Sequence, residues 1–377
     1  MTYYLVGSIA VLFVCVAFWY FNRVHLVSTL MEKHHYFQNA QRKIFISYKS
    51  KNSMEACALA ETLMLLGYRV WIDQYRIPLF EDTQFEDYLD KGMEQCRKAI
   101  LMTNQLYSNS YWCRYEINKI LKNYGRGNVC QIHIPNDTNI HDILPKEILP
   151  LYKEVPAIDW PNSATKTARY LSDKGFIKYV GTFPSPPVIP PAQNVSKLLI
   201  KEAGIFFNTS SWTKLDLSNQ DAASNEFDRH GYMLKINKAK VMLHILVQDA
   251  GKTSRPKKVT EKDYDDRTVF LENREVAKRH IVMMRQIGFN FDLVGSHLVE
   301  ILGFSHLAIT YFMWNESLLT PPCYMRKYVL TFPGKTVPND VDIIITARVI
   351  DPKQRDIHSL FQYSPLLNQF ITSAHWS

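Results

Sequence analysis

Apolar segments of strand length alternate with helix-forming segments between residues 43 and 121, and this alternation constrains the fold more than any other feature of the chain. A first apolar run at 44–47 leads into a helix that Ser53 caps and Gly67 ends, and a second run follows at 69–72. The buried stripe of this helix consists of Ala56, Leu59, Ala60, Leu63 and Leu66. Strands joined by helices pair in parallel, and the helices cover both faces of the sheet. We therefore predict an α/β unit.

Three further segments complete the predicted sheet, at residues 98–103, 128–134 and 155–158. The unit then runs from residue 42 to 178 and holds a parallel five-stranded sheet. A further helix starts near Ser110 and stops at Gly125. In a doubly wound sheet of this kind, ligands bind in the crevice at the carboxyl ends of the strands. We therefore look for functional residues directly after the strands.

The first 22 residues carry no charge, and residues 3–21 are almost wholly apolar. About 20 such residues cross the hydrocarbon of a bilayer as a helix. A cleaved signal peptide is the alternative, but the basic start and the small-residue cleavage site that it needs are missing. The first positive charges, from Arg23 onwards, all follow the segment. We therefore predict a single-pass membrane anchor at 1–22, a spacer at 23–41 and a cytoplasmic location for the rest.

The formal net charge is +8, and the Lys and Arg residues are scattered in small clusters. No nucleic-acid-binding motif accompanies them, so we expect a membrane surface and no nucleic acid as the partner of this charge. None of the six cysteines forms a C-x-x-C pair, and the histidines lack ligand spacing. This pattern predicts reduced thiols and no metal site.

A proline-rich segment at 181–193 reads as a stiff, extended linker that holds two domains apart. The following domain, 194–377, has alternating strand patterns, of which 341–350 is the clearest. Helices are predicted at 275–287, 294–302 and 365–373. We therefore predict an α+β domain with an antiparallel sheet, and its order of strands and helices faintly resembles the Mog1/PsbP-like fold. We assign it to sensing or regulating the first domain, with nucleation of assembly favoured over masking.

Three ordered blocks resemble the Toll/interleukin-receptor (TIR) domain family. They are Phe45-Ile46-Ser47-Tyr48, Gly67-Tyr68-Arg69-Val70-Trp71-Ile72-Asp73 and Trp112-Cys113-Arg114-Tyr115-Glu116. The resemblance implies a flavodoxin-like α/β fold. TIR domains either assemble signalling scaffolds or cleave NAD⁺, and with the predicted anchor the chain is similar to prokaryotic-type TIR NAD hydrolases.

The resemblance also implies a set of site residues. Glu116 takes the position of the catalytic glutamate, and Trp112 lines the site. The other substrate-binding candidates lie at the ends of the first two strands and in the loop that follows: Ser47, Tyr48, Asp73, Arg76 and Ile77. Trp112 and Glu116 are four residues apart and share one helix face, where they flank the core stripe and need not be buried.

One carboxylate suffices for NAD⁺ cleavage, whereas ordinary glycosidases use two. Nicotinamide leaves as a neutral molecule, so no general acid is needed, and the carboxylate stabilises the oxocarbenium-like charge. The predicted activity takes NAD⁺ as substrate and needs neither cofactor nor metal.

Each site residue also has a structural explanation. Glu116 complements the dipole at the start of a helix, Trp112 fits a packing role, and Asp73 or Ser47 can cap a turn. Two functions therefore stay open. The first is an NAD⁺ glycohydrolase that acts on self-association in immune or anti-phage defence signalling and yields ADP-ribose or a cyclic form. The second is a non-enzymatic adaptor that binds another TIR domain through the loop at 74–82.

Overall fold

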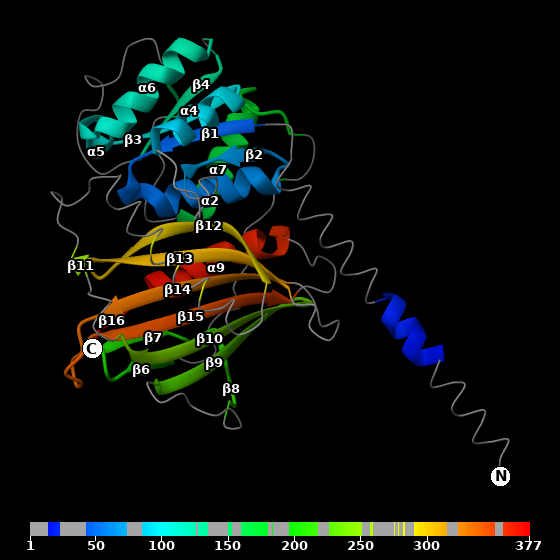
Figure 1. The fold of residues 1–377 in the computed structure, drawn as a ribbon, viewed down its shortest axis with the longest axis vertical. Coiled ribbons are helices and arrows are strands. Elements are labelled where there is room, and N and C mark those ends of the chain that lie inside the picture. The colour runs from blue at the N-terminus through cyan, green and yellow to red at the C-terminus, as the bar shows by residue number, and fades with distance from the viewer. Residues whose placement is uncertain are drawn as a thin grey trace.

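The computed structural model describes two units of the chain, one above the other in Figure 1. The described residues are 14–22, 43–73, 85–125, 127–134, 150–152, 160–179, 183, 196–217, 226–250, 257–258, 275, 278, 282, 290–314, 323–350 and 357–377.

The first unit is an α/β sandwich, which confirms the predicted class. Its elements follow the order β1 (Lys43–Tyr48), η1 (Ser50–Asn52), α2 (Ser53–Leu65), β2 (Arg69–Trp71), α4 (Phe85–Gln95), β3 (Lys98–Thr103), α5 (Gln105–Asn109), α6 (Tyr111–Asn123), β4 (Val129–His133), β5 (Pro150–Tyr152) and α7 (Trp160–Asp173). The strands form a parallel sheet in the order β2-β1-β3-β4-β5. The fifth strand of the sheet lies at Pro150–Tyr152, and the predicted strand at 155–158 falls outside the described residues.

Helices cover both faces of this sheet. Ile44 and Ile46 of β1 pack into the core on the side of α2 and α7, while Phe45 packs into the core on the side of α4, α5 and α6. Such alternation of direction with continuous burial is typical of a parallel strand. On the α4 side, the Phe45 ring stacks on Trp71 at 4.9 Å between centroids. Gly92 of α4 lies against this indole, since a Cβ there would stand 2.1 Å from the ring.

The described residues of the second unit include the predicted antiparallel sheet and the long helix α9. Its elements are β6 (Lys197–Ile200), β7 (Ile205–Asn208), β8 (Thr213–Leu215), β9 (Glu226–Ile236), β10 (Ala239–Asp249), β11 (Lys257–Lys258), β12 (Asn290–Ile301), β13 (Phe304–Trp314), β14 (Cys323–Phe332), β15 (Val341–Ile350), α9 (Ile357–Thr372) and β16 (His375–Trp376). The large sheet has the order β11-β13-β14-β15-β10-β9-β8, with β12 paired to β13, and a small sheet has the order β16-β7-β6.

The helix predicted at 294–302 is wrong, because this segment belongs to β12. Leu302 and Gly303 both have positive φ, at 55° and 77°, so they form a tight turn that returns the chain as β13. The apolar spacing of the segment fits a helix as well as a strand, and the hairpin decides between them. The predicted helix at 365–373 is present but starts earlier, at Ile357, with Pro365 inside it. Most of the predicted helix at 275–287 lies outside the described residues.

The predicted single-pass membrane location is contradicted by the structure. No helix in the part of the chain that the structure describes is long and apolar enough to cross a membrane. The described part of the N-terminal segment is a helix over residues 14–22. Residues 1–13 lie outside the described ranges.

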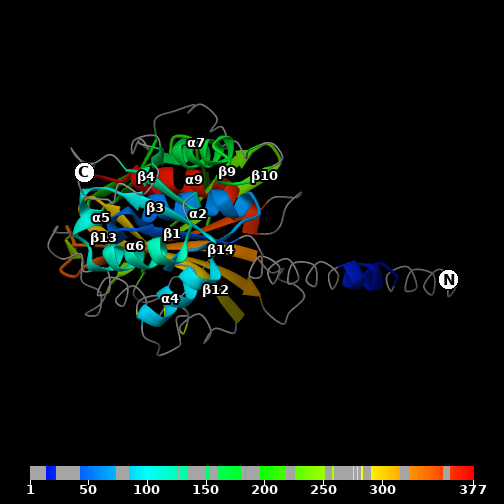
Figure 2. The ribbon, with the colours of Figure 1, turned by 90° about the horizontal axis from the view of Figure 1, so that it is seen from above.

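The two units are in direct contact, so the expectation that the linker holds them apart is also wrong. Helix α2 of the first unit packs on α9 and on β12 of the second (Figures 1 and 2), and α7 packs on α9 as well. Buried apolar side chains from both units form one continuous core cluster. Of the linker at 181–193, only residue 183 lies within the described residues.

Candidate functional site

The hydroxyl of Ser47 and the carboxylate of Glu116 meet at the carboxyl end of β1. Ser47 Oγ donates a hydrogen bond to Glu116 Oε2. The same Oγ lies 2.6 Å from the hydroxyl of Tyr107, which comes from α5. All three side chains are buried. The structure thus brings together the predicted Ser47 and Glu116 at the sheet edge where ligands bind in this fold.

Two asparagines support this cluster from the neighbouring strand end and turn. Asn104 directly follows β3, and its Oδ1 accepts a hydrogen bond from the backbone N–H of Tyr107 at 2.9 Å, which caps α5. Its Nδ2 donates to Asn52 Oδ1 at 2.8 Å. Sequence reasoning missed Tyr107, Asn104 and Asn52. A signal was present for Asn104, because a cap-forming residue directly after a strand, three residues before an aromatic hydroxyl, occupies the predicted site edge.

Trp112 and Glu116 are both only 8% exposed, so the expectation that they need not be buried is wrong. The Trp112 ring packs edge-on against Phe85 of α4 at 4.9 Å and against Tyr115 at 6.0 Å. Helix α6 packs beside α4 on this face of the sheet, so the flank of its apolar stripe is covered as well as the stripe itself. Ser110 caps this helix by accepting from the N–H of Cys113 at 3.4 Å.

Tyr48 and Asp73 form a second polar pair, on the other side of β1. The Tyr48 hydroxyl donates to Asp73 Oδ1 at 2.5 Å. Successive strand residues point to opposite faces, and Tyr48 packs with the apolar cluster that includes α2. The pairs Ser47–Glu116 and Tyr48–Asp73 therefore flank the end of one strand. Arg76 and Ile77 lie outside the described residues.

Beside the site, the phenol of Tyr115, which precedes Glu116 in the sequence, has a shifted pKa. Burial and a hydrogen bond to Asp90 at 2.9 Å raise the pKa of the Tyr115 phenol. Asp90 also holds Lys119 at 2.8 Å. Within the described ranges, no group of three His, Cys, Asp or Glu side chains is arranged to hold a metal ion. The chemistry available beside Ser47 is that of the Glu116 carboxylate with adjacent hydroxyl groups, and Asp73 supplies a second carboxylate on the other side of β1.

Residues 44–170 match the family model described as the TIR domain. The fold, the strand order and the three sequence blocks agree with this match, and this part of the chain is a TIR domain. A search of curated proteins found no match.

Solved structures supply distant likenesses to each unit. One is the TIR domains of the activated Roq1 resistosome that directly recognises the pathogen effector XopQ, with 19% identity, a TM-score of 0.23 and coverage of 26% of this chain. The match spans 59% of that structure.

Two further likenesses are to the folds that the second domain was expected to resemble. Cyanobacterial PsbP from Synechocystis is 10% identical with a TM-score of 0.31, and the match covers 48% of this chain and 92% of that one. The Ran-binding protein Mog1p of Saccharomyces cerevisiae is 10% identical with a TM-score of 0.29, at 48% and 95% coverage. Nothing about activity follows from similarity at this level.

Proposed function

We propose that the TIR domain cleaves NAD⁺ at its nicotinamide–ribose bond and that Glu116 carries the reaction. The supporting observation is the carboxylate of Glu116, hydrogen-bonded to Ser47 at the carboxyl edge of the sheet. Water then bonds to the ribose carbon that nicotinamide has left and gives ADP-ribose and a proton, or a nucleophilic atom of the same molecule bonds there and gives a cyclic form.

The proposed chemistry uses the low polarity around this carboxylate. Nicotinamide departs from NAD⁺ as a neutral base, and positive charge develops on the ribose. An anion in a site with little water stabilises such charge strongly. The ribose hydroxyls would replace Ser47 as hydrogen-bond donors to Glu116, while Tyr107, 2.6 Å away, keeps the displaced Ser47 hydroxyl paired.

Burial of the site suggests why the activity would depend on assembly. With Glu116 and Trp112 each 8% exposed, NAD⁺ reaches the carboxylate only after neighbouring side chains move. We propose that self-association of TIR domains causes this opening, as expected for an effector in immune or anti-phage defence that is silent until clustered.

Nicotinamide release from the full chain, fused to an inducible dimerisation module, tests the proposal. We expect release on clustering, and a loss of at least about a hundredfold in Glu116→Gln, because the buried negative charge is removed with its shape retained. Glu94→Gln is the matched control, since Glu94 is exposed on α4. Equal release by the clustered wild type and Glu116→Gln would exclude catalysis by Glu116.

A non-enzymatic adaptor is the second candidate, and the packing of Trp112 favours it. The indole has aromatic neighbours on two sides, Phe85 and Tyr115, which suits a core residue as well as a site residue. This function predicts capture of a partner TIR domain that survives Glu116→Gln and fails in Pro78→Asp. Capture that is unaffected by Pro78→Asp would rule out the loop at 74–82 as the binding surface.

A further inference from the structure

The first turn of α2 is bound to the C-terminal domain rather than capped in the usual way. Ser53, the first residue of α2, is 1% exposed, and its hydroxyl donates to the backbone carbonyl of Leu298 in β12 at 2.7 Å. Asn52 holds the N-cap position, but its side chain makes no capping hydrogen bond. Serine and asparagine are among the best capping residues. Here the Ser53 hydroxyl hydrogen-bonds to Leu298 and the Asn52 side chain to Asn104, and neither side chain caps α2.

The bond that Asn52 makes instead leads to the candidate site. Its Oδ1 accepts from Asn104 Nδ2 at 2.8 Å, and Asn104 in turn caps α5 through the N–H of Tyr107. The hydroxyl of Tyr107 lies 2.6 Å from Ser47 Oγ, which donates to Glu116. An unbroken series of buried polar contacts and one peptide link thus joins β12 to the carboxylate.

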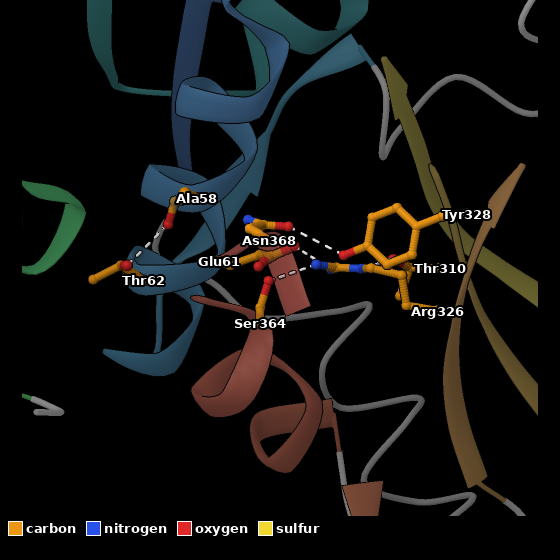
Figure 3. A network of polar contacts seen from close by, with 8 residues as sticks. All are labelled: Ala58, Glu61, Thr62, Thr310, Arg326, Tyr328, Ser364 and Asn368. Carbon is orange, nitrogen blue, oxygen red and sulfur yellow. Dashed lines mark hydrogen bonds and ion pairs between the residues drawn. The ribbon is translucent and has the colours of Figure 1, made fainter. Parts of the chain in front are cut away.

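A second contact fixes α2 about two turns further along. The guanidinium of Arg326, on β14, pairs with Glu61 of α2, and it also donates to Ser364 of α9 at 2.5 Å and to Thr310 of β13 at 3.0 Å (Figure 3). Arg326 is 0% and Glu61 is 3% exposed. Figure 3 shows the guanidinium reaching from the sheet across to α2 and α9.

We propose that the C-terminal domain positions the candidate site of the TIR domain, with Ser53 and Asn52 as positioning residues. The domain holds α2 at Ser53 and Glu61, and the turn η1 that precedes α2 carries Asn52 against the cap of α5. The orientation of Tyr107 and Ser47 toward Glu116 therefore depends on a contact made outside the TIR domain. Deletion of the C-terminal domain would remove this support rather than a mask.

Hydrogen–deuterium exchange of the full chain tests the positioning directly, without substrate. Ser53→Ala removes the donor to Leu298 at little steric cost, and we expect roughly five- to tenfold faster exchange in η1 and in α5, the usual consequence of one lost hydrogen bond. Helix α4 lies outside the series of contacts and should exchange at the wild-type rate. Ser172→Ala on α7, a half-buried serine, is the matched control and should change neither segment.

Two results would overturn the proposal: no change of exchange in α5, even if β12 and η1 change, or an equal rise in all segments including α4. Coupling is reciprocal, so Asn104→Ala should accelerate exchange around Leu298 in β12. This second variant decides the question if Ser53→Ala does not fold.

The effect on turnover rests on the proposed NAD⁺ cleavage, whereas the exchange result does not. If the wild type releases nicotinamide, Ser53→Ala should lower kcat with little change in KM. If the wild type releases none, the proposed function fails while the exchange experiment still decides the positioning role.

Discussion

Arg326→Met is the sharpest test of how the two domains are joined. The substitution keeps much of the side-chain length and removes the guanidinium that contacts Glu61, Ser364 and Thr310. The Glu61 carboxylate, 3% exposed, would then lie in the interface without this cation. Breaking a buried pair from one side costs about 3–5 kcal/mol, because the remaining charge stays desolvated.

The double variant Glu61→Leu/Arg326→Met separates this charge penalty from lost packing. With both charges removed, apolar side chains replace the pair within a core cluster that spans both units. We expect the double variant to regain most of the lost stability, since replacing a buried pair by apolar residues is often neutral or stabilising.

Urea unfolding followed by circular dichroism measures both effects as changes in the free energy of unfolding. Lys119→Met is the control, because the side chains of the Lys119–Asp90 pair are 40% and 31% exposed, so its loss should change the free energy of unfolding much less. A cost below about 1 kcal/mol for Arg326→Met, or a double variant as unstable as the single one, would refute the buried interdomain pair.

Three further perturbations follow from the structure. Gly92→Ala should lower the free energy of unfolding by about 1–3 kcal/mol, because the new Cβ would press into the Trp71 ring; Gly125→Ala, whose nearest neighbour would be 3.9 Å away, should have a much smaller effect, and equal urea midpoints would contradict the packing. Burial and, secondarily, the charge of Glu300 raise the pKa of Glu55 from 4.5 to about 7. The folded state then holds this proton more tightly than the unfolded state, so the contribution of Glu55 to stability is greatest below pH 4.5 and is lost as the pH rises toward 7. Glu55→Gln should therefore reduce the stability difference between pH 5 and pH 8 by on the order of 2–3 kcal/mol, and an unchanged pH profile would refute the assignment. Tyr107→Phe should cost about 1 kcal/mol through the lost contact to Ser47, whereas Tyr111→Phe, 62% exposed, should cost nothing measurable in the same urea titration.

The sequence by itself determined the α/β class, the TIR domain and the meeting of Ser47 with Glu116. Strand periodicity is local, and in a parallel sheet the carboxyl ends of neighbouring strands lie at one edge. The resemblance to TIR domains placed Ser47, at the end of the first strand, and Glu116, on a helix after the third strand, at this edge. The three sequence blocks at 45–48, 67–73 and 112–116 predict the family because their spacing reflects the order of strands and helices along the chain.

Only the tertiary structure decided burial, register and the partners of distant segments. The i, i+4 spacing placed Trp112 and Glu116 on one helix face, but the neighbouring α4 covers that face. The segment at 294–302 has an apolar spacing that suits two structures, and the turn at Leu302 and Gly303 selects the strand. Ser53 reads as a helix cap, yet its hydroxyl bonds to Leu298, 245 residues further along the chain. A local sequence pattern does not specify such a partner, because the energy of that contact depends on how the surfaces of the two units meet.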